Sequence, residues 1–288
     1  MKVVGGSASV QLARGIAAEL RVGFVDVAFE KHPGGFPDGE RYVRLLGPVA
    51  REHVVLVQTT HPDQMIVEFL LLADAIRDAG AQQITVVVPY FGYGRQDKRF
   101  LDGEPVSAKT IGKHISVVAN ELLTMTIHNP DLLKTFPISA RDVDGVPALG
   151  RYLKGVDVDM LVAPDDNAVR LVKTASAICG APYDHLEKER IDSYRVRITP
   201  KKLDVRGKSV AIVDDVISTG GTISTVAKEL RNQGARRVVA VCVHGLFVDN
   251  AEANLTACDD VIATDTIQSP HTKVTVAPEF AAAIRALD

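Results

Sequence analysis

Short apolar runs alternate with longer amphipathic stretches along most of this 288-residue chain. The runs are rich in valine and isoleucine and apolar at successive positions, which is typical of strands buried on both faces of a parallel sheet. They predict strands at Val54–Gln58, Ile84–Pro89, Leu122–Ile127, Met160–Ala163, Ser209–Val213 and Val238–Val243.

The stretches between these runs have helical spacing. In one of them the apolar positions that fall on a single helix face are Ile66, Phe69, Leu70, Ala73 and Ile76. We predict helices over Val10–Leu20, Gln64–Ala79, Ser107–Val118, Asn167–Cys179 and Thr222–Asn232. Regular alternation of strand and helix predicts an α/β fold with a mostly parallel sheet flanked by helices.

One junction between helix and strand occurs twice. Gly80 and Gly234 each stand where a predicted helix ends and the next strand begins, a position that favours a left-handed residue. Such junctions are common in α/β proteins, but Pro137–Pro147, with its proline, glycine and aspartate, has the composition of a linker. We therefore predict two similar domains, residues 1–145 and 146–288.

Charge and composition exclude several classes of protein. The formal net charge is −3, so there is no sequence-wide basic surface, and we expect no nucleic-acid partner. No apolar run is long enough to span a membrane and no signal-peptide segment follows the N-terminus, so we expect a cytoplasmic protein that does not bind membranes. The three cysteines are widely spaced, which indicates neither a zinc knuckle nor a disulfide framework.

The strongest local signal follows the predicted strand that ends at Val213. Two carboxylates, Asp214 and Asp215, come first, and the turn before the next helix consists of Ser218, Thr219, Gly220, Gly221 and Thr222. Glycines allow backbone N–H groups to approach a phosphate closely, and a helix N-terminus adds partial positive charge. The carboxylates suit vicinal hydroxyls or a Mg²⁺ ion that bridges them. Phosphate at one end and a diol at the other describe a phosphorylated pentose.

This turn lacks the Gly-Lys-Ser/Thr ending of a Walker A loop and the Gly-x-Gly-x-x-Gly pattern of a dinucleotide loop. It could also be an ordinary strand-to-helix turn with Thr222 as the N-cap. The run Asp214–Thr222 resembles the phosphoribosyl-diphosphate binding motif of the type I phosphoribosyltransferase superfamily. That motif alone does not separate the transferases that consume phosphoribosyl diphosphate from the synthetase that makes it.

Further motifs resemble those of the ribose-phosphate pyrophosphokinase family, in the same order and over essentially the whole chain, from Gly5 to Ile267. They are Phe36–Glu40, Tyr90–Arg99, Thr126–His128, Leu186–Arg190 and the turn described above. The resemblance implies two type I phosphoribosyltransferase-like domains. It also implies transfer of the β,γ-diphosphoryl group of ATP to the anomeric hydroxyl of ribose 5-phosphate, with Mg²⁺, giving 5-phosphoribosyl 1-diphosphate and AMP.

The same resemblance assigns roles to residues. The N-terminal domain would bind ATP through Phe36, Asp38, Gly39, Glu40, Arg95, Gln96, Asp97 and His128. The C-terminal domain would bind ribose 5-phosphate through Arg190, Asp214, Asp215, Ser218, Thr219, Gly220, Gly221 and Thr222. Lys188 and Arg190 would be catalytic, on a mobile loop, and His128 and Asp165 would ligate metal. The adenine contacts come from a neighbouring subunit in the family, which implies a homo-oligomer, at least a dimer.

Several of these residues also have plainer interpretations. Asp38-Gly39 could be a simple turn, and Glu187–Arg190 a solvated surface run. His128 could be a hydrogen-bonded structural residue, and Asp165 a helix N-cap, with Asp166 an equal candidate for its role.

The sequence also departs from the family at two places. Asn129-Pro130-Asp131 stands where many members have Ala-x-Gln, and Ser218 where many have aspartate. The serine is compatible with phosphate binding because it removes a negative charge.

Two other functions are compatible with the phosphate turn. A phosphoribosyltransferase would need no ATP segment, so Phe36–Glu40 and Arg95–Asp97 argue against it. A non-catalytic regulatory paralogue should have lost its catalytic cations or its ribose carboxylates, and Lys188, Arg190 and the Asp214-Asp215 pair are all present.

Overall fold

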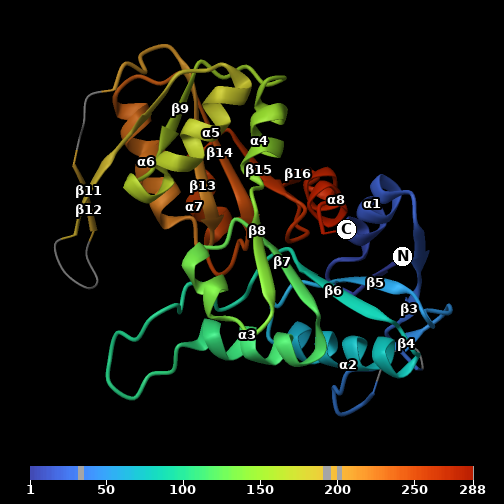
Figure 1. Ribbon diagram of the computed structural model, residues 1–288. Coiled ribbons are helices and arrows are strands. Elements are labelled where there is room, and N and C mark those ends of the chain that lie inside the picture. Colours follow the sequence, from blue (N-terminus) through green and yellow to red (C-terminus); the bar gives the residue numbers. More distant parts are fainter. Residues whose placement is uncertain (32–35, 191–195, 200–202, 288) are drawn as a thin grey trace. The chain divides into compact units, whose positions relative to one another are not determined.

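Two sheets of six parallel strands, with equivalent strand orders, organise the chain (Figure 1). The computed structural model describes residues 1–31, 36–190, 196–199 and 203–287. Internal contacts divide the chain into unit 1, Met1–Asp144 with Thr275–Asp288, and unit 2, Gly145–Val274. The predicted fold class, two similar α/β domains with mostly parallel sheets, is confirmed.

In unit 1 the strand order is β2-β1-β5-β6-β7-β8. These strands are β1 (Lys2–Gly5), β2 (Gly23–Val25), β5 (His53–Val57), β6 (Gln83–Val88), β7 (Glu121–Met125) and β8 (Ser139–Val143). Helices α2 (Gln64–Asp78) and α3 (Ser107–Val118) cover one face of the sheet, and α1 (Val10–Leu20) and α8 (Ala277–Arg285) pack together on the other (Figure 1). An antiparallel pair, β3 (Val27–Ala28) and β4 (Arg44–Leu45), and the 3-10 helix η1 (Pro130–Thr135) complete the unit.

In unit 2 the strand order is β10-β9-β13-β14-β15-β16. These strands are β9 (Met160–Ala163), β10 (Tyr183–His185), β13 (Ser209–Ile217), β14 (Arg237–Gly245), β15 (Asp260–Thr264) and β16 (Thr272–Val274). The helices are α4 (Val146–Leu153), η2 (Asp166–Ala168), α5 (Val169–Cys179), α6 (Gly221–Asn232) and α7 (Ala251–Leu255). A separate antiparallel pair consists of β11 (Glu187–Arg190) and β12 (Val196–Thr199). None of the helices within the described residues is long and apolar enough to cross a membrane.

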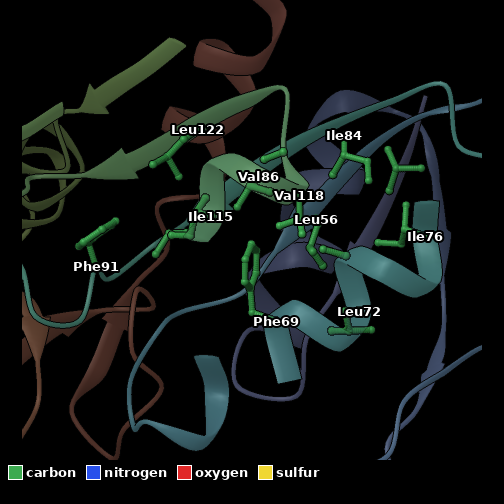
Figure 2. Close-up of a cluster of buried hydrophobic side chains, with 14 of the residues drawn as sticks. Leu56, Phe69, Leu72, Ile76, Ile84, Val86, Phe91, Ile115, Val118 and Leu122 are labelled. Carbon is green, nitrogen blue, oxygen red and sulfur yellow. The ribbon is translucent and has the colours of Figure 1, made fainter. Parts of the chain in front are cut away.

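The core of unit 1 lies between its sheet and helices α2 and α3 (Figure 2). Phe69 and Ile76 of α2 are fully buried and belong to one cluster with Leu56 of β5 and Val86 of β6. Each large apolar side chain buried in this way stabilises the fold by about 1.5–3 kcal/mol. The cluster fixes α2 against the sheet and therefore fixes the loop that leads into that helix.

The buried face of α2 is rotated relative to the predicted face. Ile66 and Leu70 are only half-buried, whereas Leu72 is fully buried, and so is the carboxylate residue Glu68. A run of consecutive apolar residues does not define one face, so the contacts of the folded chain decide which side of α2 faces the core.

The two units repeat one device at equivalent places. Gly80 (φ 82°) and Gly234 (φ 94°) both end a helix in the left-handed region. Each glycine carbonyl then accepts a hydrogen bond from the turn before the preceding strand, from Arg51 N at 2.7 Å and from Gly207 N at 2.8 Å. The sequence signal for two similar halves therefore reflects a shared geometry.

The predicted linker Pro137–Pro147 is wrong, because this segment contains β8, which pairs in parallel with β7. β8 is an edge strand with mostly half-buried or exposed residues, so it lacks the apolar run that marks an internal strand. The change of unit at Gly145 lies beside the predicted boundary. The last helix, α8, which the sequence predicts to be in the second domain, packs on α1 of unit 1.

We expect Gly80→Ala and Gly234→Ala each to lower the free energy of unfolding by about 1 kcal/mol, because an L side chain is strained at positive φ. A Cβ at either position meets nothing closer than 3.5 Å, so the loss reports backbone strain. Urea titrations measure it. Gly155→Ala is the control, since Gly155 has an ordinary φ and its added Cβ would come no closer than 3.6 Å to another atom. Equal effects at all three positions would contradict this account.

Candidate functional site

The carboxyl end of β13 extends beyond its neighbour β9. Residues Val210 to Ile212 pair with β9, whereas pairing with β14 continues to Ile217. Asp214 and Asp215 therefore lie within the strand, in the part that β9 no longer covers, and not after its end as the sequence predicts. The strand continues because β14 still offers backbone partners there, although the residues are charged.

Asp214 lies in an electrostatically unfavourable place. Burial raises its pKa well above the ordinary value for aspartate, and the charges of Asp215 and Asp165 raise it further. A cation or a hydroxyl donor that contacts such a carboxyl group stabilises its charged form. Its Oδ1 accepts a hydrogen bond from Asp215 N at 2.9 Å, which fixes the orientation of the carboxylate.

Asp165 and Asp166 differ clearly in their contacts. Asp165 Oδ1 accepts from Asn167 N at 3.0 Å and caps η2, and its charge acts on Asp214. Asp166 is exposed, and its Oδ1 lies 3.7 Å from His185 Nε2. Capping and proximity to the acidic pair thus coincide in Asp165, so the two interpretations from the sequence are compatible.

The turn after β13 contains backbone N–H groups that take no part in hydrogen bonds among the described residues. Among the described residues, no acceptor takes a hydrogen bond from the N–H groups of Thr219, Gly220, Gly221 or Thr222. Helix α6 begins at Gly221, and Gly220 is its N-cap residue at φ 74°, so Thr222 is not the cap. Four consecutive N–H groups at a helix N-terminus form a ready site for an anion.

The backbone carbonyls of this turn accept hydrogen bonds from residues near α7. Asn254 Nδ2 donates to Thr219 O at 2.8 Å, and Val248 N donates to Ser218 O at 3.1 Å. A Cβ on Gly220 would come within 3.2 Å of Leu255 Cγ. Because the carbonyls are tied to the segment around α7, the turn keeps its shape without a ligand.

Lys188 and Arg190 lie on β11, which pairs with β12 in an antiparallel ladder that joins Lys188 to Ile198 and Arg190 to Val196. The backbone of these strands is described, but the side chains are outside the described part of the chain. The roles predicted for the two cations therefore stay predictions.

In unit 1 a polar cavity of about 420 Å³ lies at the carboxyl ends of β5 and β6. Arg95 and Gln96, both predicted to contact ATP, line it. Gln96 is held in place because its Oε1 accepts from Ser107 Oγ at 2.7 Å, at the start of α3. The other lining residues are Thr60, His61, Asp63, Tyr90, Gly92 and Tyr93.

Asp97 and His128 are brought to the same edge of unit 1. Asn129 Nδ2 donates to Asp97 Oδ2 at 2.7 Å, which ties the loop after β6 to the loop after β7. His128, immediately before Asn129, is exposed. The departure from the family pattern at Asn129 thus supplies a contact between two predicted ATP segments.

The segment Phe36–Glu40 forms an exposed turn that does not line this cavity. Gly39 adopts φ 81°, Gly39 N donates to Phe36 O at 3.0 Å, and Glu40 N donates to Asp38 Oδ1 at 3.1 Å. The simple turn interpretation of Asp38-Gly39 is correct for the geometry. It leaves the side chains of Asp38 and Glu40 accessible.

Sequence reasoning missed the loop after β5. Thr60, His61 and Asp63 line the cavity, and Tyr93 Oη donates to Asp63 Oδ1 at 2.9 Å. Burial lowers the pKa of His61, and the charge of Asp63 raises it. The available signal was position alone, since this loop in unit 1 is equivalent to the phosphate turn in unit 2.

No three His, Cys, Asp or Glu side chains converge into a metal cage within the described residues. A Mg²⁺ ion usually takes one or two protein carboxylates and completes its shell with substrate oxygens and water. The raised pKa of Asp214 beside Asp215 and Asp165 shows oxygen donors whose mutual repulsion a cation would relieve. The donor set therefore fits Mg²⁺ held jointly with substrate.

Comparisons with known proteins agree over the whole chain. Two family models match, the N-terminal domain of ribose phosphate pyrophosphokinase over residues 1–118 and the phosphoribosyl transferase domain over residues 149–279. The ribose-phosphate pyrophosphokinase of Methanopyrus kandleri is 41% identical over 295 residues, covering 100% of this chain and 99% of the relative. That of Methanosarcina mazei is 41% identical over 288 residues, covering 99% and 95%.

A solved structure is similar over nearly the full length as well. Phosphoribosylpyrophosphate synthetase from Mycobacterium smegmatis has a TM-score of 0.81 and 29% identity, covering 99% of this chain and 98% of that one.

We expect Asp214→Asn to stabilise the ligand-free chain at pH 8 in the presence of a chelator. The pKa of Asp214 is raised in the folded state, so its favourable contribution to the free energy of unfolding is fully present below the ordinary aspartate pKa, about 4. That contribution is lost as pH rises through the raised folded pKa. Urea midpoints should therefore be higher for the variant at pH 8, with a difference that shrinks toward pH 5. Asp249→Asn, at an exposed position, is the control; a pH-independent difference for Asp214→Asn would refute the expectation.

Proposed function

The chain belongs to the ribose-phosphate pyrophosphokinase family, and we propose that it transfers the β,γ-diphosphoryl group of ATP to the anomeric hydroxyl of ribose 5-phosphate. The products are 5-phosphoribosyl 1-diphosphate and AMP. The observation that carries the proposal is the edge of unit 2, where the backbone N–H groups of one turn have no acceptor among the described residues and lie next to a carboxylate pair. Full-length similarity to named pyrophosphokinases favours this reaction over a phosphoribosyltransferase or a regulatory paralogue.

Unit 2 binds ribose 5-phosphate in this proposal. The 5-phosphate accepts hydrogen bonds from the N–H groups of Thr219–Thr222 and from the hydroxyls of Ser218, Thr219 and Thr222. Asp214 and Asp215 accept from the ribose 2- and 3-hydroxyls. Burial, together with the charge of Asp215, raises the pKa of Asp214, so hydroxyl donors from the ribose would stabilise its charged form.

Unit 1 binds ATP in its polar cavity. Arg95 supplies a planar cation for phosphate oxygens, and Gln96 and Asp97 supply polar contacts whose positions Ser107 and Asn129 hold. His61, which burial keeps neutral over a wider pH range, and Tyr93 are further groups that line the cavity. His128 follows on the adjacent loop.

The chemistry consists of positioning and charge neutralisation. The anomeric oxygen attacks the β-phosphorus and forms a new P–O bond, while its proton passes to water. The bond from the β-phosphorus to the α,β-bridging oxygen breaks, so that AMP leaves with that oxygen. Lys188 and Arg190 stabilise the charge that develops on the transferred phosphates. His128 would ligate the Mg²⁺ that accompanies ATP, and Asp165 would contribute to a second Mg²⁺ site near the ribose; ions bound there would neutralise phosphate charge. Asp165 is oriented for this by its capping bond to Asn167 N.

The segment Phe36–Glu40 serves the active site of a neighbouring subunit. Its exposed turn lies outside the cavity of its own unit, which supports use by a second copy of the chain. Phe36 stacks on adenine, and the carboxylates of Asp38 and Glu40 accept from its amino group. At least a dimer is therefore needed for a complete site.

We expect AMP to form at a rate that requires ribose 5-phosphate, ATP and Mg²⁺ together, measured by chromatography. Asp215→Ala should raise the KM for ribose 5-phosphate and lower kcat, because the diol loses an acceptor. Asp78→Ala is the control, because Asp78 is an exposed aspartate at the end of α2. AMP release that does not depend on ribose 5-phosphate would remove the proposed function, and an unchanged KM for ribose 5-phosphate would remove the diol assignment.

We expect two inactive variants to restore activity when they share an oligomer. Phe36→Ala and Lys188→Ala each impair turnover, but a mixed pair has one site with both native residues. Because one of its two sites is intact, a mixed dimer should recover about one half of native activity. Co-expressed subunits with different affinity tags, purified through both tags, provide the material. If mixed oligomers stay as inactive as the parents, each site belongs to a single chain.

A further inference from the structure

Helix α2 contains a carboxylate that is fully removed from solvent. Glu68 has 0% exposed surface and lies on the face of α2 that packs on the sheet. A buried carboxylate is costly unless donors surround it. Its position in the middle of an apolar face therefore requires a structural explanation.

Glu68 ties together the connections that leave β1 and β5. Its Oε1 accepts from Ser7 N at 2.7 Å and from Gln58 Nε2 at 2.8 Å, and its Oε2 accepts from Ser7 Oγ at 2.7 Å. Gly6 is needed for the close approach, because a Cβ there would lie 2.3 Å from Gln58 Cδ. Three donors satisfy most of the demand of this carboxylate within the unit.

The two units show why this place matters. Val4 pairs with Leu56 in unit 1 as Val162 pairs with Ile212 in unit 2. Counting forward from these pairs, Gln58 corresponds to Asp214 and Ser7 to Asp165. The edge that in unit 2 holds mutually repelling carboxylates is in unit 1 closed by hydrogen bonds to Glu68.

One further contact of Glu68 leads to the predicted adenine segment. Arg41 NH1 lies 3.9 Å from Glu68 Oε2, and Arg41 NH2 donates to Gln64 Oε1 at 2.8 Å. The Arg41 side chain is 32% exposed, so this pair is screened less than a surface pair. Arg41 follows directly after the turn Phe36–Glu40.

That turn has few anchors of its own. Its internal hydrogen bonds fix its shape, but Asp38, Gly39 and Glu40 are exposed. Among the described residues, the edge-on packing of Phe36 on Tyr42, with ring centroids 6.0 Å apart, joins the two ends of the turn, and the side chain of Arg41 ties its C-terminal end to α2. A turn that presents side chains into solvent needs such a fixed point if it is to bind a ligand without a large ordering cost.

We propose that Glu68 is a positioning residue for nucleotide binding, which acts through Arg41 to hold the segment Phe36–Glu40 in its binding orientation. The buried charge attracts Arg41 at a fixed place on α2, and Gln64 limits the orientation of the guanidinium. ATP affinity depends on this clamp, whereas ribose 5-phosphate, which binds in unit 2, does not. The inference rests on the proposed function, since it assigns Phe36–Glu40 to ATP.

Two substitutions separate the clamp from the stability of the fold. Glu68→Gln keeps the shape and removes the charge; its amide oxygen still accepts from Ser7 N and Gln58, and the Ser7 hydroxyl can accept from its NH₂. Arg41→Gln removes the cation at a partly exposed position. Arg44→Gln is the matched control, because Arg44 is an exposed arginine three residues further along the chain.

We expect Arg41→Gln to raise the KM for ATP on the order of ten-fold, with kcat and the KM for ribose 5-phosphate changed by less than about two-fold. Glu68→Gln should raise the KM for ATP in the same direction, and the double variant should match Arg41→Gln alone, because the two residues act as one unit. Arg41→Lys should recover part of the loss. Arg44→Gln should leave all three parameters unchanged.

The outcomes distinguish the inference from its premise. If the native chain forms no AMP in a ribose-dependent reaction, the proposed function fails. If the native chain is active but Arg41→Gln leaves the KM for ATP unchanged, or if the effects of the two substitutions simply add, the clamp fails. If Glu68→Gln raises the KM for ATP and the KM for ribose 5-phosphate equally and also lowers the urea midpoint of unfolding, Glu68 has a structural role only.

Discussion

All six strands of each sheet are parallel, and this constraint decides where chemistry can occur. Every strand in a parallel sheet ends at the same edge, so each strand-to-helix connection leaves from one line of backbone. The groups at that line lose their ladder partners and must find others. The two units of this chain satisfy these backbone groups differently. Unit 1 satisfies them with its own side chains, whereas in unit 2 the N–H groups of Thr219–Thr222 have no acceptor among the described residues.

The difference between the units arises from few residues at equivalent positions. In unit 2, β13 continues past the end of β9 on the support of β14, and this extension carries Asp214 and Asp215 beyond the covering strand. In unit 1, β5 ends at Val57, and the side chain of the next residue, Gln58, donates a hydrogen bond to Glu68. Glu68 and its donors occupy this edge in unit 1, whereas burial and neighbouring charges raise the pKa of Asp214 at the equivalent edge in unit 2. The two units thus carry different polar groups at equivalent positions of one topology.

The turn after β13 is held by contacts with the segment around α7. The segment around α7 holds the carbonyls of Ser218 and Thr219, and a Cβ on Gly220 would crowd Leu255. Holding the carbonyls back directs the N–H groups away from the protein. The cost of this arrangement is carried by Asp214, whose charged form is unfavourable in the free chain. Binding sites commonly store such local strain, and ligand binding releases it.

The sequence by itself determined the fold class and the location of the phosphate turn, because both depend on local patterns. Valine-rich runs, helical spacing and a glycine-rich turn after a strand are visible without any long-range contact. Only the tertiary structure decided the rest. The sequence pattern did not predict β8, because an edge strand needs no apolar run. The assignment of α8 to unit 1 depends on its packing against α1. The choice of Asp165 over Asp166 as neighbour of the acidic pair, the cavity that includes His61 and Tyr93, and the burial of Glu68 all require residues far apart in sequence to meet. No periodicity records which charged residue on a helix will face the core, because that depends on the donors that the folded chain brings to it.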